Sequence, residues 1–166
     1  MLFSFPQRKL ELNINLKIVD TYLERTNEFD FLGLIINENL NWNAHINKIL
    51  NKTSRAIAIL KRLHKLLPTS TLLLIYNSLL LPHISYSILA WGFTCDRVLK
   101  LQKTAIRLLC HTHFYAHTEP LFKKLNVLRV SDLFKQKALN FYYRYCKNEL
   151  PGYFRDMFAT LPTTHQ

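Results

Sequence analysis

Residues 43–67, NAHINKILNKTSRAIAILKRLHKLL, carry the strongest structural signal in this chain of 166 residues. Apolar side chains recur there at helical spacing and share one face of a helical projection: Ile46, Ile49, Leu50, Ile57, Leu60 and Leu67. Cations share the opposite face: Lys48, Lys52, Arg55 and Arg62. The pattern predicts an amphipathic helix with a basic back. Leu67-Pro68 should end this helix, and Thr69 or Ser70 should cap the next one.

The chain downstream keeps the helical period. Residues 70–81 are apolar on nearly every side, which is typical of a helix in the core of a bundle. Pro82 should kink or split that helix, its second half should run to about Trp91, and Gly92 should cap it. Further helices are expected at 96–110, 119–125 and 131–147, with a loop at 111–118. The helix at 96–110 has a second basic side, formed by Arg97, Lys100, Lys103 and Arg107.

The chain upstream has the period of two that indicates strands. Leu12, Ile14, Leu16 and Ile18 alternate with polar residues, as in a half-buried strand. A short strand is expected at 22–26 and a third at 29–36, where Gly33 suggests a bulge or a close backbone approach. The predicted fold class is therefore α+β, mostly α, with a short antiparallel sheet followed by a helical bundle.

Composition and charge limit the possible partners. Hydrophobic residues make up 49% of the chain, which is enough for a core and argues against intrinsic disorder. The net charge of +11 favours a polyanionic partner, either nucleic acid or an anionic membrane surface. Residues 72–91 are long and apolar enough to span a bilayer, but Asn77, Pro82 and His83 interrupt them. We therefore expect a buried helix pair there and no membrane partner.

The cysteines and the first residues bear on the compartment. Cys95, Cys110 and Cys146 are odd in number and contain no C-x-x-C pair, so a disulfide framework is not expected. The start, MLFSFPQRKL, has too short an apolar run for a signal peptide. The expected location is nuclear or cytoplasmic, and not secreted.

Motifs that would carry chemistry are sparse. No G-x-S-x-G, P-loop or G-x-G-x-x-G occurs, and no two acidic residues are adjacent, although two-metal phosphoryl transfer requires clustered carboxylates. His111, His113 and His117 could hold zinc with Cys110, but no second ligand cluster completes the pattern. We therefore predict no catalytic residue and no metal site, while a carboxylate site assembled from distant residues stays open.

Aromatic side chains interleave with cations near the C-terminus. The set consists of Phe141, Tyr142, Tyr143 and Tyr145. Such residues can stack on nucleic-acid bases, but ordinary helix packing with outward tyrosine hydroxyls is the interpretation we favour.

Four blocks of the sequence stand out: FDFLGLIINENLNWNAHINKIL from Phe29, PHISYSILAWG from Pro82, VLKLQKTAIRLL from Val98 and HFYAHTEPLFKKLNVLRVSDLFK from His113. In this order they resemble blocks of LINE-type (non-LTR, Jockey-like) retrotransposon reverse transcriptases. Together they reach from residue 29 to residue 135 of the chain. The match to the family departs at Asn37, where the family often has Asp.

The resemblance implies a domain layout. Residues 1–42 would be a remnant of the palm of an RNA-directed DNA polymerase, 43–158 the helical thumb and connection, and 159–166 a flexible tail. Leu32 and Gly33 would lie in a hairpin like the primer grip. The Mg-binding aspartates and the fingers of the family lie upstream of the matching blocks, so the chain is expected to be a truncated transposable-element copy.

The resemblance also implies a function. The fragment alone should be inactive and need no cofactor, but its two basic helix faces should bind a template–primer duplex of RNA and DNA without reading sequence. The missing fingers and palm would be its protein partners. The alternative is a catalytically inert helical interaction module, or a relic with no nucleic-acid function.

Overall fold

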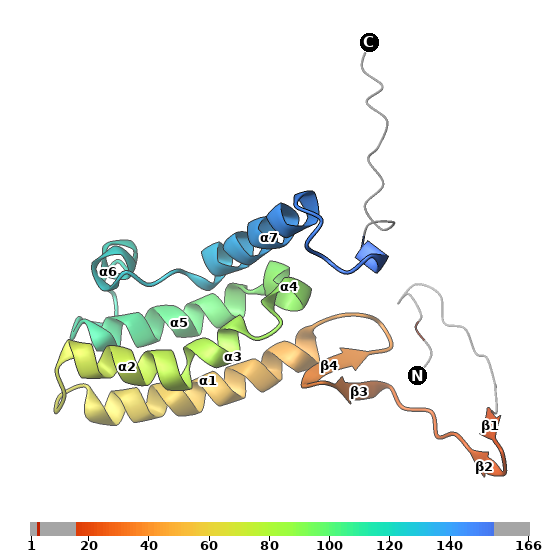
Figure 1. Cartoon of the computed structure of the whole chain (residues 1–166). Helices are drawn as coiled ribbons and strands as arrows, with labels where there is room; N and C mark the ends of the chain where they lie inside the picture. The colour runs from red at the N-terminus through yellow and green to blue at the C-terminus, as the bar shows by residue number, and fades with distance from the viewer. Residues whose placement is uncertain (1–2, 4–15, 155–166) are drawn as a thin grey trace.

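A computed structural model describes residue 3 and residues 16–154 (Figure 1). Within these residues the fold is α+β and mostly α, as predicted, with two small antiparallel sheets ahead of the helices. The strands are β1 (Lys17–Ile18), β2 (Thr21–Tyr22), β3 (Glu28–Phe31) and β4 (Leu34–Asn37). The helices are α1 (Asn43–Leu63), α2 (Thr69–Leu79), α3 (Leu81–Ser85), α4 (Ile88–Trp91), the 3-10 helix η1 (Gly92–Thr94), α5 (Asp96–Leu109), α6 (Glu119–Leu125) and α7 (Val130–Cys146).

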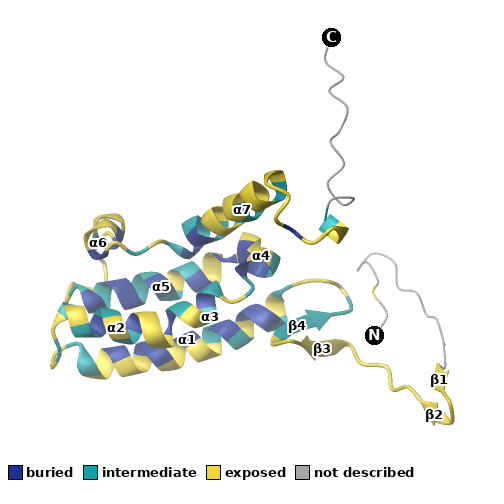
Figure 2. Cartoon of the chain, in the orientation of Figure 1, coloured by how far each residue is buried: buried dark blue, intermediate teal, exposed yellow. Residues whose placement is uncertain are grey.

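The core lies where α1, α2, α3 and α5 meet (Figure 2). The apolar face predicted for residues 43–67 is the buried one, with Leu60 fully inaccessible and Ile46 and Ile49 nearly so. Helices α1 and α5 pack along one another and run in the same direction (Figure 1). Their C-terminal ends lie together, and the rings of His64 and His111, which follow these ends, stack with their centroids 6.3 Å apart. Helix α7 covers α3, α4 and α5.

A buried glutamine ties α5 to its neighbours. The Gln102 amide donates to the Tyr76 hydroxyl of α2 at 2.8 Å and to the Leu128 carbonyl at 2.9 Å. Its carbonyl oxygen accepts from the Val130 N–H at 2.8 Å. Since every polar group of this side chain has a partner, the glutamine is compatible with full burial. It fixes the linker between α6 and α7 against the core.

The segment after α1 is more divided than predicted. Pro82 does split the apolar stretch, since α2 ends at Leu79 and α3 begins at Leu81. A further break follows at Ser87, whose φ of 45° is left-handed. Neither Thr69 nor Ser70 caps α2, because α2 begins at Thr69 and that hydroxyl donates to the Leu109 carbonyl of α5 instead. None of the helices in the described part of the chain is long and apolar enough to cross a bilayer.

Gly92 follows α4 at the predicted capping position, but not for the predicted reason. Its φ of −64° is right-handed, so the helix end does not require glycine. A Cβ added there would lie 2.6 Å from a ring carbon of Phe134 on α7. The missing side chain therefore lets α7 pack directly on the backbone after α4.

The antiparallel pairing expected near the N-terminus is present, but as two separate hairpins and not as one small sheet. Among the described residues β1 pairs with β2 and β3 pairs with β4, and each pair is closed by its own two-residue turn. The strand expected at 29–36 is itself divided by the turn at Leu32-Gly33, so Gly33 is not a bulge. Leu16 and Ile18 are 55% and 61% exposed, so no half-buried face forms there. Residues 12–15 and 159–166, to which a strand and a tail were assigned, lie outside the described residues.

Candidate nucleic-acid interface

The basic face of α1 stands largely unpaired. Lys52, Arg55 and Arg62 are exposed, and their side chains make no hydrogen bond or ion pair with any residue that the structure describes. Lys48 differs, because its ammonium donates to the Asp30 carboxylate at 2.5 Å and to the Gly33 carbonyl at 3.2 Å. From Lys48 to Arg62 the helix rises about 21 Å, at 1.5 Å per residue. Three of the four predicted cations are thus available to a polyanion.

The basic side of α5 is mixed. Arg97 and Lys100 are exposed, and Lys103 is half-buried. Arg107 instead has a structural role, because its Nε donates to the Ala116 carbonyl at 3.0 Å and its guanidinium lies 5.6 Å from the centre of the Phe114 ring. Both contacts fold the loop at 111–118 back on α5. The spacing of the cations could not separate this residue from its neighbours.

The deficit of acid around these helices is a signal that the helical spacing did not capture. Residues 39–118 contain one acidic residue, Asp96, and ten lysines and arginines. Two of the ten, Lys61 and Lys65, fall outside the predicted faces, although both are exposed. Lys61 lies in the last turn of α1 and Lys65 follows this helix. The charge of this part of the chain is therefore left mostly uncompensated.

The β3–β4 turn is clamped to the bundle by one tyrosine. The Tyr86 hydroxyl, on the segment after α3, donates to the carbonyl of Leu32. A Cβ added to Gly33, whose φ is 86°, would lie 3.4 Å from the Tyr86 ring. That distance is an ordinary van der Waals contact, so the turn favours glycine for its positive φ and not for the close backbone approach expected from the sequence. A role of Leu32 and Gly33 in holding a primer stays a prediction.

An open pocket of about 340 Å³ lies between this turn, α1 and α3. The residues that line it are Gly33, His45, Lys48, Ile49, Lys52, Pro82, His83 and Tyr86. The lining contains two lysines and two histidines and no carboxylate. Asp30, just outside, pairs with Lys48, and this hydrogen bond holds the pKa of the Asp30 carboxyl below its usual value.

Both histidines of this pocket are biased toward the neutral form. Burial, and next the charge of Lys48, lower the pKa of His45. Burial, and next the charge of Lys52, lower the pKa of His83. The His45 Nδ1 accepts the Ile35 N–H at 3.3 Å, so in the neutral ring the proton sits on Nε2. That buried Nε2 has no hydrogen-bond partner among the described residues.

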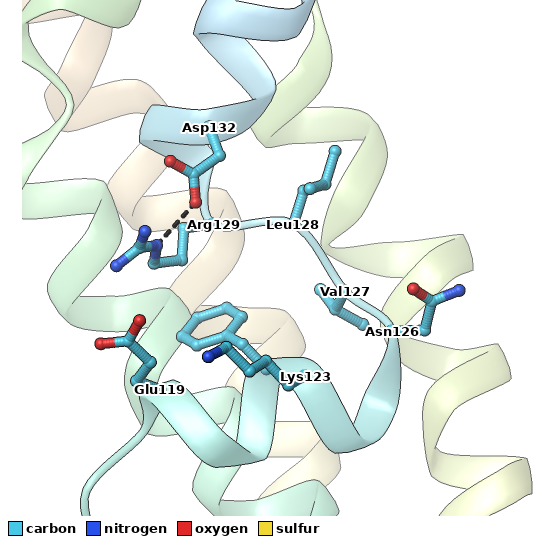
Figure 3. Close-up of a pocket in the computed structure, with 8 residues that line it drawn as sticks. Glu119, Lys123, Asn126, Val127, Leu128, Arg129 and Asp132 are labelled. Carbon is cyan, nitrogen blue, oxygen red and sulfur yellow. Dashed lines mark hydrogen bonds and ion pairs between the residues drawn. The ribbon is translucent and has the colours of Figure 1, made fainter.

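Figure 3 shows a second pocket, of about 220 Å³, where α6 meets α7. Two acids and two cations line it: Glu119, Asp132, Lys123 and Arg129. Arg129 donates through Nε to Asp132 at 2.6 Å, so one pair of charges is already matched. This balance makes the α6–α7 pocket a poorer place for an anion than the pocket beside the β3–β4 turn.

The remaining sequence candidates are dispersed. Within residues 16–154, no group of three or more His, Cys, Asp or Glu side chains is arranged to hold a metal ion. On α7, Tyr142 and Tyr143 are exposed while Phe141 and Tyr145 are half-buried. Phe141 packs edge to face on Phe154 at 5.5 Å, in agreement with the packing interpretation.

The features that bear on function are thus the unpaired cations of α1 and α5 and the acid-free pocket beside the β3–β4 turn. Neither is a catalytic centre by itself. Comparisons of this chain with models of protein families, with curated proteins and with solved structures found no match.

Proposed function

We propose that the chain is a nucleic-acid-binding fragment of a reverse transcriptase of the LINE type, and that α1 and α5 hold a template–primer duplex by its phosphates. The observation that carries the proposal is the row of exposed, unpaired cations on α1, within eighty residues that contain a single acid. The choice of this family rests on the four ordered sequence blocks that resemble it. The absence of adjacent carboxylates from the sequence argues against polymerisation by this chain alone.

The arrangement suits backbone contacts better than base readout. A duplex strand carries one phosphate per about 3.4 Å of axis, so the rise of about 21 Å along α1 runs past roughly six phosphates. Lysine and arginine ends at helical spacing match charge without presenting a fixed donor pattern to base edges. Binding should therefore be independent of sequence and should weaken steeply as salt is added.

The test is fluorescence anisotropy of a labelled RNA–DNA hybrid titrated with the chain across a salt series. The triple variant Lys52→Gln, Arg55→Gln and Arg62→Gln should reduce the slope of log K against log salt by about three. A matched control removes the same charge from α6 and α7, by Lys124→Gln, Lys135→Gln and Lys137→Gln, and should leave most of the slope in place. Equal slopes for the two variants, or no binding by the parent chain at low salt, would contradict the proposal.

The prediction of inactivity needs its own assay. A primed RNA template, nucleotides and Mg²⁺ are incubated with the purified chain, and products are resolved by length. No extension is expected. Extension that survives repurification would show that the chain holds a carboxylate site which neither its sequence nor its described residues reveal.

A second candidate function is a protein-interaction module, and the exposed aromatics of β3 favour it. Phe29 and Phe31 are 55% and 53% exposed, and the neighbouring Leu32 is 77% exposed. Apolar groups gathered on one exposed strand are typical of interaction surfaces. A mass that rises with concentration in sedimentation equilibrium, falls in Phe29→Ser with Phe31→Ser, and comes without salt-sensitive nucleic-acid binding would select this function over the first.

A further inference from the structure

The pocket beside the β3–β4 turn has the size and lining of a small-anion site. Its volume of about 340 Å³ lies at the low end of the range for ligand pockets. Three elements border it: the turn supplies Gly33, α1 supplies Lys48 and Lys52, and α3 supplies His83. No carboxylate lines it, in contrast to the α6–α7 pocket.

The charges at this pocket do not cancel. Lys48 is offset by Asp30, whose carboxylate it contacts directly. Lys52 has no such partner among the described residues, and its charge helps to lower the pKa of both His45 and His83. One full positive charge is therefore left over at the pocket wall, with ring nitrogens beside it.

His45 places a buried polar side chain at the wall of this pocket. It is 3% exposed, its Nδ1 is engaged by the Ile35 N–H, and its Nε2 is left as a buried donor without an acceptor among the described residues. Buried polar groups in folded proteins are nearly always hydrogen-bonded. His45 also lines the pocket, but its Nε2 is covered from solvent, so this ring can report on an anion bound in the pocket without contacting it.

We propose that the pocket between the β3–β4 turn, α1 and α3 binds a single phosphate group, held by Lys52 and His83 beside the buried ring of His45. Phosphate fits because it offers several acceptor oxygens at once and carries the opposite charge. The molecule that carries this phosphate depends on the proposed function. If the chain holds a polynucleotide, the bound group is the phosphate at the end of that polynucleotide, and otherwise it is free inorganic phosphate.

The test follows the histidine ring resonances of the intact chain by NMR while inorganic phosphate is added. Saturable shifts at His45 and His83, with His64 as an internal reference outside the pocket, are expected. Lys52→Gln and His83→Gln should each weaken phosphate binding about tenfold or more, whereas Lys61→Gln on the exposed side of α1 should not. Unchanged affinity in both pocket variants, or no shift at either pocket histidine, would overturn the proposal.

A second arm identifies the source of the phosphate. Two oligonucleotides that differ only in a terminal phosphate are compared in the same titration. A preference for the phosphorylated one that is lost in His83→Gln supports a polynucleotide source, and equal binding with a persisting response to inorganic phosphate supports the free anion. Salt-sensitive binding of both oligonucleotides without any shift at His45 or His83 would leave the proposed function standing and remove the pocket.

Discussion

Single residues connect the helices of this molecule through hydrogen bonds, and Gln102 is the clearest example. Its amide connects α5 with α2 and with the linker before α7 through three hydrogen bonds. The residue pattern did not predict this burial, because a glutamine between basic residues on a helix is ordinarily exposed. Burial of a polar side chain depends on partners from other elements, and those partners lie 26 and 28 residues away.

The Gln102→Leu substitution should cost about 2–3 kcal/mol of unfolding free energy. It leaves the Val130 N–H without its acceptor and the Tyr76 hydroxyl without its donor, and buried orphan groups are costly. Urea denaturation measures the loss. Gln136→Leu on the exposed side of α7 is the control and should change stability by less than about 0.5 kcal/mol. Equal effects at the two positions would refute the network.

Leu32 is the reverse case, a residue poorly matched to its position. Its φ of 49° is unusual for a branched apolar side chain, and the turn it shares with Gly33 has positive φ at both residues. Leu32→Asn should stabilise the protein by up to about 1 kcal/mol, because asparagine tolerates this conformation. Thermal unfolding tests this against Leu66→Asn, a position equally exposed but without positive φ. A loss of stability in Leu32→Asn would contradict the view that leucine is strained by the positive φ at this position.

The ionisation of buried Tyr76 should lower the stability of the fold at alkaline pH. Burial raises its pKa to about 12, from 10.0. The folded state therefore holds the phenol proton more tightly than the unfolded state. The contribution of Tyr76 to the free energy of unfolding is complete below pH 10 and is lost as the pH rises toward 12. The loss should reach about 2–3 kcal/mol by pH 12. Unfolding free energies of the parent and Tyr76→Phe between these pH values provide the comparison, and parallel curves would contradict the effect.

At the scale of elements, the helical period proved a better guide than the alternation of strands. The helix at 119–125 was predicted to the residue, and those at 96–110 and 131–147 to within one residue, because each must bury an apolar stripe against the bundle. The hairpins bury little, so their pattern lacked the core that makes alternation informative. Of the candidate site, the cations were predictable, whereas the structural use of Arg107 and Lys48 depends on contacts with distant backbone.

The β3–β4 hairpin is the element that a single substitution should loosen most readily. Tyr86→Phe removes the hydroxyl that binds the Leu32 carbonyl and leaves the ring in place. Amide hydrogen exchange in β3 and β4 should accelerate roughly threefold to tenfold, while α1 and α5 keep their protection. Tyr115→Phe, at a residue 86% exposed, should change neither. Acceleration throughout the bundle would show that the hairpin and the core open together.

At the scale of the whole molecule, an unbalanced charge of +11 dominates. Like charges on α1 and α5 repel one another in the folded chain. Salt weakens this repulsion, and at 0.1 M exposed charges more than about 10 Å apart are largely screened from one another. Raising NaCl from about 0.05 to about 0.5 M should therefore raise the melting temperature. The triple variant of Lys52, Arg55 and Arg62 should respond less, and a melting temperature that falls with salt would contradict the view that these charges are unpaired.

The contact between Tyr86 and Leu32 has a consequence for the order of folding. It joins positions 54 residues apart, so the chain must first assemble α1, α2 and α3 before the turn has anything to dock on. The pocket beside the turn, which needs Gly33 as one wall, exists only in molecules that have taken this last step. Any anion that binds there draws the population toward the docked hairpin and makes ligand affinity a direct readout of how much of the chain has finished folding.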